Sequence, residues 1–331
     1  MILIGDVGGT KVTLAWASGS ADAPQISGLK RFESAAYPGL EPLLVDFLSE
    51  SGTRPQATCL GVAGPIVHGD ATLPNLGWTL NRARMSQNLD LGPTRFLNDL
   101  EALAHGALIL PPEGLRSLHP GVPGSGTHRV VVAPGTGLGE ALIIQGAEGP
   151  VVVATEGGHT ELGPRDPQQD RLVAFLRAEY GHVSAERAIS GPGLNALYRF
   201  LAADGVAGDP ELLEATQAAP RHAEAIGQAA LQGACPRAEE AVSLFFNLLG
   251  AETSNSVLKA MGLGGVFLGG TLIPALLNDQ YFAAFMAGYL DVGRYSALVA
   301  KAPISLITDP MTHLLGAAKV GLKAHPSHQE S

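Results

Sequence analysis

The chain begins with an apolar run that leads into a glycine-rich turn and then into alternating apolar and polar positions. Residues 2–4 are apolar, residues 5–10 read Gly-Asp-Val-Gly-Gly-Thr, and Val12, Leu14 and Trp16 alternate with Thr13 and Ala15. A period of two is typical of a β-strand. The turn is therefore predicted to join two strands, whereas a Walker A loop or a Rossmann fingerprint would open a helix.

The same pattern recurs in the middle of the chain. Residues 129–133 form an apolar run, residues 134–139 read Pro-Gly-Thr-Gly-Leu-Gly, and residues 140–144 form a second predicted strand. A further glycine pair, Gly269 and Gly270, follows a third predicted strand. This internal repeat of strand, glycine turn and strand suggests two related domains that face one another.

Other segments have patterns that predict helices, strands or a connection. Apolar residues fall on one face of a predicted helix over residues 37–50, and Asn98 and Asp99 separate a short predicted strand from a helical run. The further predicted elements are strands over 57–63 and 94–97, a Gly/Pro/Ser-rich connection over 114–127, a mostly helical region over 170–259 and a closing helix over 311–322.

Two of these predicted helices are rich in small residues, namely the helix after Asp99 and the closing helix over 311–322. Small residues allow two helices to cross closely. A crossing between domains would form a hinge that lets a cleft shut around substrates. The alternative is ordinary alanine-rich packing in the core, and the sequence leaves both open.

Composition narrows the class of protein. A length of 331 residues indicates about two domains. A net charge of −10 without a basic run argues against a nucleic-acid partner, which requires clustered Lys and Arg. Cys59 and Cys235 are the two cysteines, too few for a disulfide framework or a four-cysteine zinc site. Two cysteines that remain free thiols are typical of a cytoplasmic protein.

Two segments bear on a membrane location. The N-terminus lacks the basic region and long apolar stretch of a signal peptide. Residues 260–277 are uncharged and about long enough to cross a bilayer. Five glycines and Pro274 divide this segment into a strand, a glycine loop and the start of a helix, as in a strand buried within a parallel sheet. We therefore expect no membrane partner.

The glycine turns have the properties of phosphate-binding loops. Glycine lets a ligand approach the backbone closely, and successive N–H groups form anion-binding concavities. One such hairpin alone would be read as structural, because Gly-Gly is common in hairpin turns. Two matching copies, with hydroxyls at Thr10 and Thr136, favour the functional interpretation. Lys11 is the one lysine close to these turns in the sequence. The negative charge of a bound polyphosphate would therefore have to be neutralised largely by a metal ion. Asp6 could hold Mg²⁺ through water.

Two further sets of polar residues allow more than one interpretation. Asp99 suits a rigidly held base, but the local sequence favours an N-cap of the helix that follows. Glu156, His159 and Glu161 have the spacing of metal ligands, although zinc usually takes more nitrogen or sulfur. Carboxylates also accept two hydroxyl groups side by side, as a sugar would offer.

The motifs together resemble a known family. Asp-x-Gly-Gly-Thr with Gly-Thr-Gly-x-Gly resembles the phosphate motifs of the sugar kinase, heat-shock chaperone and actin superfamily. The segments that narrow the match to the bacterial glucokinase family are residues 96–106, 133–141, 156–164 and 181–200. The similarity runs from residue 2 to about residue 320. Related sugar kinases and repressors carry a cysteine-rich zinc motif after Glu-x-Gly-His, whereas here no cysteine follows His159 until Cys235. This difference favours the zinc-free glucokinases. Lys11 stands where many of them have Asn.

The resemblance assigns roles to residues of this chain. It implies that Asn98 and Asp99 bind the sugar, with Asp99 as general base, and that Glu156, His159 and Glu186 supply the remaining sugar contacts. For Glu186, which would otherwise be read as a solvated helix start, the role depends on the resemblance. The implied nucleotide-binding residues are Gly5, Asp6, Val7, Gly8, Gly9, Thr10, Gly135, Thr136, Gly137, Gly139, Gly269 and Gly270.

The resemblance also implies a fold and an activity. The expected fold is α/β, a two-domain actin-like ATPase (ribonuclease H-like) fold with an interdomain active-site cleft. The smaller domain is expected over residues 1–109 and 309–331, and the larger over 110–308. The implied activity is phosphorylation of D-glucose to glucose 6-phosphate by ATP and Mg²⁺, in a cytoplasmic protein that is often a homodimer.

Three alternatives remain. A kinase of another hexose or of an amino sugar would keep the same motifs. A non-catalytic sugar sensor usually carries a basic helix-turn-helix ahead of the first strand, and this chain starts at the strand. A chaperone-like ATPase would need a substrate-binding domain, which the motifs do not indicate.

Overall fold

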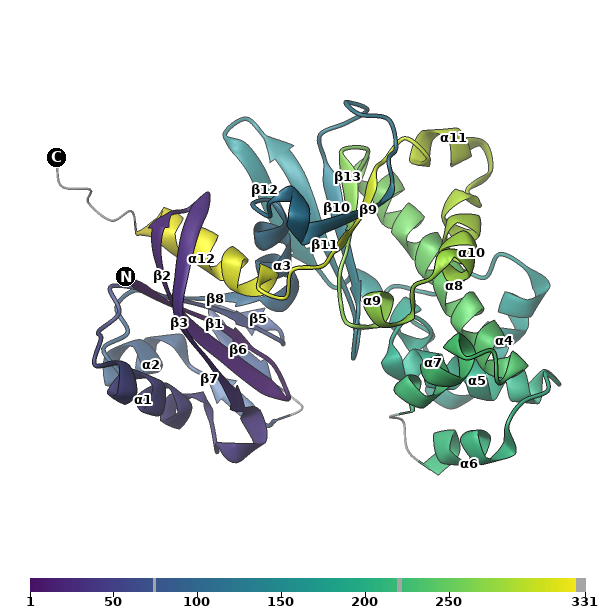
Figure 1. Ribbon diagram of the computed structural model, residues 1–331, viewed down its shortest axis with the longest axis horizontal. Coiled ribbons are helices and arrows are strands. Elements are labelled where there is room, and N and C mark those ends of the chain that lie inside the picture. Colours follow the sequence, from purple (N-terminus) through teal and green to yellow (C-terminus); the bar gives the residue numbers. More distant parts are fainter. Residues whose placement is uncertain (74–75, 219–221, 326–331) are drawn as a thin grey trace. The chain divides into compact units, whose positions relative to one another are not determined.

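Both glycine turns join antiparallel strands, as the alternating pattern predicts. The computed structural model describes residues 1–73, 76–218 and 222–325 (Figure 1). The first turn is shorter than its glycine-rich segment, because Gly5 and Asp6 already lie within β1 and pair with Leu14 and Thr13. The chain divides into two compact units, residues 1–115 with the chain from 309 onward, and residues 116–308.

The first unit is built on a five-stranded sheet of order β3-β2-β1-β4-β8. Strand β1 pairs antiparallel with β2 and parallel with β4, and β4 pairs parallel with β8. The strands of this unit are β1 (Ile2–Val7), β2 (Lys11–Ser20), β3 (Ala23–Glu33), β4 (Thr58–Val62), β5 (Ile66–Val67), β6 (Asp70–Leu73), β7 (Trp78–Leu80) and β8 (Thr94–Asn98). Its helices are α1 (Leu40–Ser51), α2 (Arg82–Asn88), α3 (Asp99–Ala107) and α12 (Thr312–Ala324), with 3₁₀ turns η1 (Ser34–Ala36) and η2 (Pro112–Gly114).

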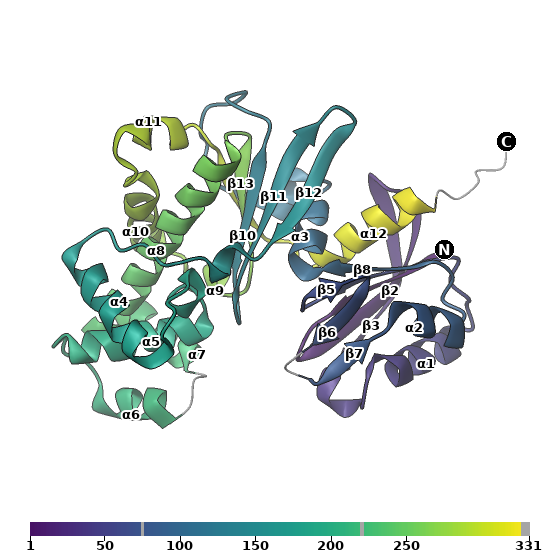
Figure 2. The ribbon, with the colours of Figure 1, turned by 180° about the vertical axis from the view of Figure 1, so that it is seen from behind.

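Alternating residues of β1 point to opposite faces of this sheet. Leu3 and Val7 pack in the cluster that includes Phe47 of α1, whereas Ile2 and Ile4 pack against α3 and α12. Figure 2 shows α12 and α1 on opposite sides of the strands. Burial of apolar side chains on both faces therefore fixes the register of β1.

The second unit is built on a six-stranded sheet of order β12-β11-β10-β13-β14-β9. Its strands are β9 (Leu115–His119), β10 (Arg129–Pro134), β11 (Leu138–Gly146), β12 (Gly149–Thr155), β13 (Gly265–Leu268) and β14 (Ile304–Ile307). Its helices are α4 (Pro167–Tyr180), α5 (Gly191–Ala203), α6 (Pro210–Ala218), α7 (Ala223–Leu231), α8 (Pro236–Ala260), α9 (Leu272–Leu276), α10 (Asp279–Leu290) and α11 (Ser296–Val299). The 3₁₀ turns are η3 (Gly157–His159), η4 (Ala185–Arg187) and η5 (Gly293–Tyr295).

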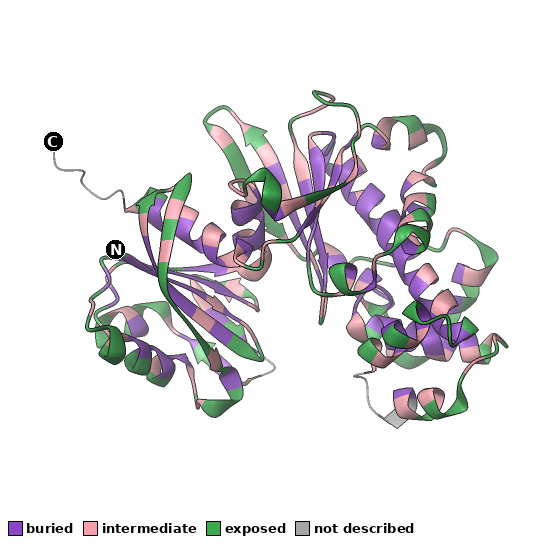
Figure 3. Cartoon of the chain, in the orientation of Figure 1, coloured by how far each residue is buried: buried purple, intermediate pink, exposed green. Residues whose placement is uncertain are grey.

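Helix α8 is the centre of the second unit. It packs against α5, α7 and α10, and Figure 3 shows most of its length buried. The expected helical region over 170–259 is confirmed. The connection expected over 114–127 is wrong for residues 115–119, which form β9 at the edge of the sheet. In the described ranges, no helix is both long and apolar enough to cross a membrane, and residues 260–277 supply β13 and α9.

Helices α3 and α12 cross closely through two glycines. A Cβ atom at Gly316 would overlap the carbonyl oxygen of Ala102, and a Cβ atom at Gly106 would overlap that of Thr312. Both helices belong to the first unit. The close crossing expected from small residues is confirmed, and it joins two helices of the same unit.

We predict that Gly316→Ala destabilises the protein. A backbone carbonyl has no rotamer that avoids the added methyl group, so the cost should be about 3 kcal/mol, the upper range for overpacking. Chemical denaturation measures it. Gly163→Ala is the control, because an added Cβ there meets no atom within 4 Å. A Gly316→Ala variant within about 0.5 kcal/mol of the parent protein would contradict the tight crossing.

Candidate active site

In the first unit, the carboxyl ends of three parallel strands bring the predicted residues to one edge of the sheet. Val7 of β1 pairs with Val62 of β4, and Val62 pairs with Asn98 of β8. Neighbouring strands lie about 4.8 Å apart, so the end of β1 is about 10 Å from the end of β8. The glycine turn after β1 and the pair Asn98–Asp99 therefore face the same space.

Asn98, and not Asp99, is the N-cap of α3. Its backbone is extended, and its Oδ1 accepts a hydrogen bond of 2.9 Å from the Leu100 N–H group. Asp99 is the first helical residue, and its Oδ1 accepts from the same N–H group at 2.9 Å. The capping role that local sequence favoured for Asp99 is therefore wrong. Since Asn98 supplies the cap, the Asp99 carboxylate is not needed to begin the helix.

Burial changes the acidity of the two carboxyl groups at this edge. Burial raises the pKa of Asp99, while the Leu100 N–H group and His313 lower it and Asp6 raises it further. Burial also raises the pKa of Asp6, and His313 lowers it. His313 lies in the first turn of α12 and acts on both carboxyl groups, a role that sequence analysis missed. A raised pKa makes the ionised Asp99 a stronger base.

The turn after β1 is held by a buried serine. Ser34, fully buried, donates from its hydroxyl to the Gly8 carbonyl at 2.9 Å and from its N–H group to the Thr10 carbonyl at 2.9 Å. Lys11 lies 4.0 Å from Glu33, and both side chains are exposed. The lysine charge is thus paired outside the turn, which leaves the backbone of the turn to meet a ligand.

The Asp6 carboxylate is suited to a hydrated cation. Asp6 is half-buried at the end of β1, and no group in the described parts of the chain donates a hydrogen bond to its side chain. Mg²⁺ is usually held by one or two carboxylates together with substrate phosphates and several waters. The residues present therefore fit Mg²⁺ bound through water.

In the second unit, the second glycine turn lies against the later glycine pair. Strands β10 and β13 are parallel, and the Gly269 N–H group donates to the Val132 carbonyl at 2.9 Å. Gly270 has a φ of +81°, and a Cβ atom there would overlap the Pro134 carbonyl. Only glycine fits this position, so the structure brings the pair Gly269–Gly270 against the turn at residues 135–137.

Glu186 fastens this second turn. Its Oε2 accepts a hydrogen bond of 2.9 Å from the Leu138 N–H group, and a Cβ atom at Gly137 would overlap the same oxygen. The N–H group of Gly191, the first residue of α5, donates to the Gly135 carbonyl at 2.9 Å. Glu186 is therefore not a solvated helix start, because its carboxylate supports the loop.

The remaining predicted residues lie on two adjacent 3₁₀ turns. Glu156 precedes η3 and His159 ends it, with Oε2 and Nε2 4.0 Å apart and side chains 72% and 61% exposed. Glu186 lies on η4, which is joined to η3 by a hydrogen bond from the Ala185 N–H group to the Thr160 carbonyl at 2.9 Å. Exposed carboxylate and imidazole groups at this spacing can receive the hydroxyls of a polar ligand.

The metal-ligand interpretation of Glu156, His159 and Glu161 is not supported. Over the described ranges, no three His, Cys, Asp or Glu side chains gather closely enough to hold a metal ion. The spacing of the three residues in sequence therefore does not become a three-ligand site.

Comparisons with known proteins agree on one family. The family model described as Glucokinase matches residues 3–324. A glucokinase of Yersinia pestis is 33% identical over 315 residues, which cover 95% of this chain and 94% of that protein. The crystal structure of a glucokinase from an Antarctic psychrotroph has a TM-score of 0.83 and 28% identity, covering 97% of this chain and 98% of its own.

A more distant structure shows the same fold. A ROK family glucokinase from Streptomyces griseus, in complex with glucose and AMPPNP, has a TM-score of 0.64 and 20% identity, covering 97% and 99% of the two chains. The chain therefore has the mixed α/β fold of the actin-like ATPase kinases, which confirms the predicted fold class.

We predict that Glu186→Ala loosens the second glycine turn. The Leu138 N–H group would lose its partner, which typically costs about 1–3 kcal/mol for a buried group. Amide hydrogen exchange at Leu138 should therefore accelerate, whereas the core amides of α8 should be unchanged. Glu161→Ala, which removes an exposed carboxylate nearby, is the control. Equal protection of Leu138 in both variants would show that Glu186 does not hold the turn.

Proposed function

The chain belongs to the glucokinase family, and we propose that it transfers the γ-phosphoryl group of ATP to O6 of D-glucose. As a family member it is a hexose kinase. The proposal of this reaction rests chiefly on the position of Asp99. Its half-buried carboxyl group has a raised pKa and lies at the same sheet edge as the glycine turn after β1.

The two glycine turns supply the binding groups for the nucleotide phosphates. Residues 8–10 and 135–137 offer backbone N–H groups with little side-chain bulk, and Gly270 is exposed beside the second turn. The AMPPNP complex of the Streptomyces griseus enzyme supports ATP as the donor. Asp6 would hold Mg²⁺ through water, and the bound ion would neutralise phosphate charge.

Asp99 acts as the general base. A sugar hydroxyl has a pKa far above 7, so its proton must be taken up as the bond to phosphorus forms. The carboxylate of Asp99 accepts that proton, while Asn98 stays in place as the helix cap and offers its amide to the sugar. His313 favours the ionised forms of both Asp99 and Asp6 whenever it carries a proton.

Glu156, His159 and Glu186 hold the other hydroxyls of the sugar. Carboxylate oxygens accept hydrogen bonds, and the imidazole can donate or accept one. Glu186 combines this role with its bond to the Leu138 N–H group, so that sugar binding and the second phosphate turn share one carboxylate. Homodimer formation and a cytoplasmic location remain expectations from the sequence, and light scattering would measure the oligomeric state.

A hexose and donor panel tests the activity. We expect turnover of glucose with ATP and Mg²⁺ to give glucose 6-phosphate, measured in a coupled dehydrogenase assay. Chelation of Mg²⁺ should abolish turnover, and added Mg²⁺ should restore it without bound zinc. A higher kcat/KM with another hexose or an amino sugar would support the alternative kinase. Glucose binding without turnover of any donor would support the sugar sensor.

Asp99→Asn tests the base. Asn keeps the size of the side chain but has no basicity, so kcat should fall by roughly 10²–10⁴. Because Asn98 caps α3, the melting temperature should change little and glucose should still bind. The activity of the parent enzyme should fall as the pH is lowered, because Asp99 becomes protonated. Since the pKa of Asp99 is raised, this loss should occur at a higher pH than it would with an unperturbed carboxylate as the base.

The matched control for Asp99→Asn is Glu101→Gln on the same helix. Glu101 forms a 3.0 Å ion pair with Arg95 and belongs to no proposed contact. Its loss should change stability by less than about 1 kcal/mol and leave kcat near the parent value. Near-normal turnover in Asp99→Asn would exclude Asp99 as the base.

A further inference from the structure

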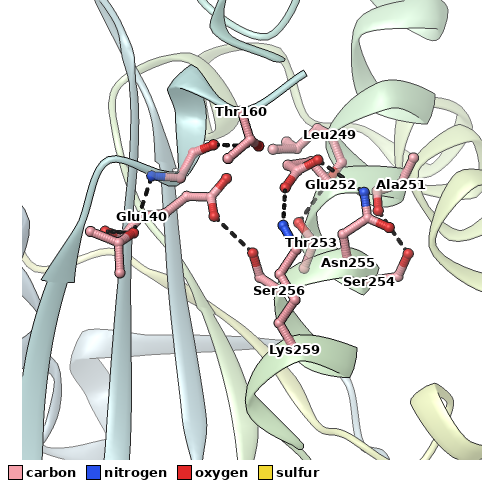
Figure 4. A network of polar contacts seen from close by, with 12 residues as sticks. Glu140, Thr160, Leu249, Ala251, Glu252, Thr253, Ser254, Asn255, Ser256 and Lys259 are labelled. Atoms are coloured by element: carbon pink, nitrogen blue, oxygen red, sulfur yellow. Dashed lines mark hydrogen bonds and ion pairs between the residues drawn. The ribbon is translucent and has the colours of Figure 1, made fainter. Parts of the chain in front are cut away.

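A buried pair of carboxyl groups lies behind the sugar-binding turn of the second unit. Glu140 of β11 and Glu252 of α8 are each 4% exposed. Figure 4 shows them on either side of Ser256, with Lys259 reaching Glu252. The Lys259 Nζ atom lies 3.7 Å from Glu252 Oε1. Lys259 therefore faces this pair of buried carboxyl groups.

Glu140 is joined to the η3 turn in two ways. Its backbone carbonyl accepts a hydrogen bond of 3.0 Å from the Thr155 hydroxyl, and that hydroxyl accepts one of 3.2 Å from the Gly157 N–H group. A Cβ atom at Gly157 would overlap the Glu140 carboxyl group, so the side chain lies directly under the turn. The Glu140 carboxyl group therefore lies against the segment between Glu156 and His159.

The Glu140 carboxyl group is only partly satisfied. Its Oε2 accepts a hydrogen bond of 2.8 Å from the Ser256 hydroxyl. In the described parts of the chain, its buried Oε1 has no hydrogen-bond partner. A buried oxygen without a donor is costly, and much more so when it carries a charge.

The charged groups that face Glu140 both come from α8. Burial, followed by Glu252, raises the pKa of Glu140 to about 7, whereas the Ser256 hydroxyl and Lys259 lower it. The residues that meet Glu140 from β12 and η3, Thr155 and Gly157, carry no charge. Glu140 therefore exchanges its proton near neutral pH, and the ionised form has an unpaired buried oxygen beside a second carboxylate.

We propose that Glu140 is a positioning residue that couples sugar binding to pH. Protonated, it packs under the η3 turn and keeps Glu156 and His159 in place. Ionised, it moves away from Glu252 toward solvent and displaces Gly157, so glucose affinity falls as the pH rises through neutrality. The inference rests on the proposed function, since it assumes that Glu156 and His159 bind glucose.

Protonation of Glu140 also changes the free energy of unfolding, and the direction of the pKa shift determines the sign of that change. The pKa of Glu140 in the folded protein is raised above its value in the unfolded chain. Its contribution to the unfolding free energy is therefore fully present below about pH 4.5, the value for an unperturbed Glu, and is lost as the pH rises through about 7. Glu140→Gln should thus raise the melting temperature relative to the parent protein at pH 8 and not at pH 5.

The test compares glucose binding by the full chain at pH 6 and pH 8, measured by calorimetry without nucleotide. In the parent protein we expect Kd to rise by about fivefold, the lower range for coupled sites. Glu140→Gln keeps the shape of the side chain without the charge, so its Kd should change less between the two pH values than the Kd of the parent protein does, and its kcat should stay near that of the parent. Glu148→Gln, on the exposed β11–β12 hairpin, should behave as the parent protein.

A second variant covers the possibility that Glu140→Gln folds poorly. Ser256→Ala removes the hydroxyl that lowers the pKa of Glu140, so Glu140 should stay protonated to a higher pH. The rise in Kd between pH 6 and pH 8 should then be smaller than in the parent protein, while kcat changes little. The proposal is overturned if Glu140→Gln retains the parent's pH dependence, if the parent shows none, or if the variants alter only the melting temperature. If the parent protein neither binds nor phosphorylates glucose, the proposed function itself fails, which is a distinguishable result.

Discussion

Parallel pairing in register is the constraint on which the candidate site depends. In the first unit it aligns the ends of β1, β4 and β8, and in the second it aligns β10 with β13. Parallel strands all end at one edge of their sheet, so the turns that follow them converge. Asp6 approaches Asp99 for this reason, although many residues separate them in the chain. The glycine pair 269–270 meets the turn at 135–137 for the same reason.

Glycine acts in this protein chiefly by leaving space. At Gly137 and Gly157 the missing side chain admits a carboxyl group, from Glu186 and Glu140 respectively. At Gly106 and Gly316 it admits the backbone of a crossing helix. The first pair connects the second glycine turn and the η3 turn to acidic side chains. The second pair attaches the last helix to the sheet that positions Asp99. The high glycine content therefore reflects close approach as well as turns.

Charged residues make up only 16% of the chain, and a few carboxyl groups near the candidate site are buried or half-buried. The pKa of Asp99 and that of Asp6 are raised by burial and lowered by His313. Glu140 and Glu252 share one lysine in the second unit. A carboxyl group that is buried with too few partners is easily protonated, which is consistent with the base proposed in one unit and the pH-dependent support proposed in the other.

The sequence by itself determined the strand–turn–strand repeats, the family and the fold class, because these depend on local alternation and on contiguous motifs. It did not predict β3 and β12, since both are edge strands with many exposed residues and lack the apolar alternation that marks a strand. Asn and Asp cap helices equally well, so only the backbone conformation at residue 98 decided between Asn98 and Asp99. The environments of His313, Glu140 and Glu186 were likewise decided by tertiary structure. Burial and charge around a side chain come from residues that are distant in sequence, and only folding brings them together.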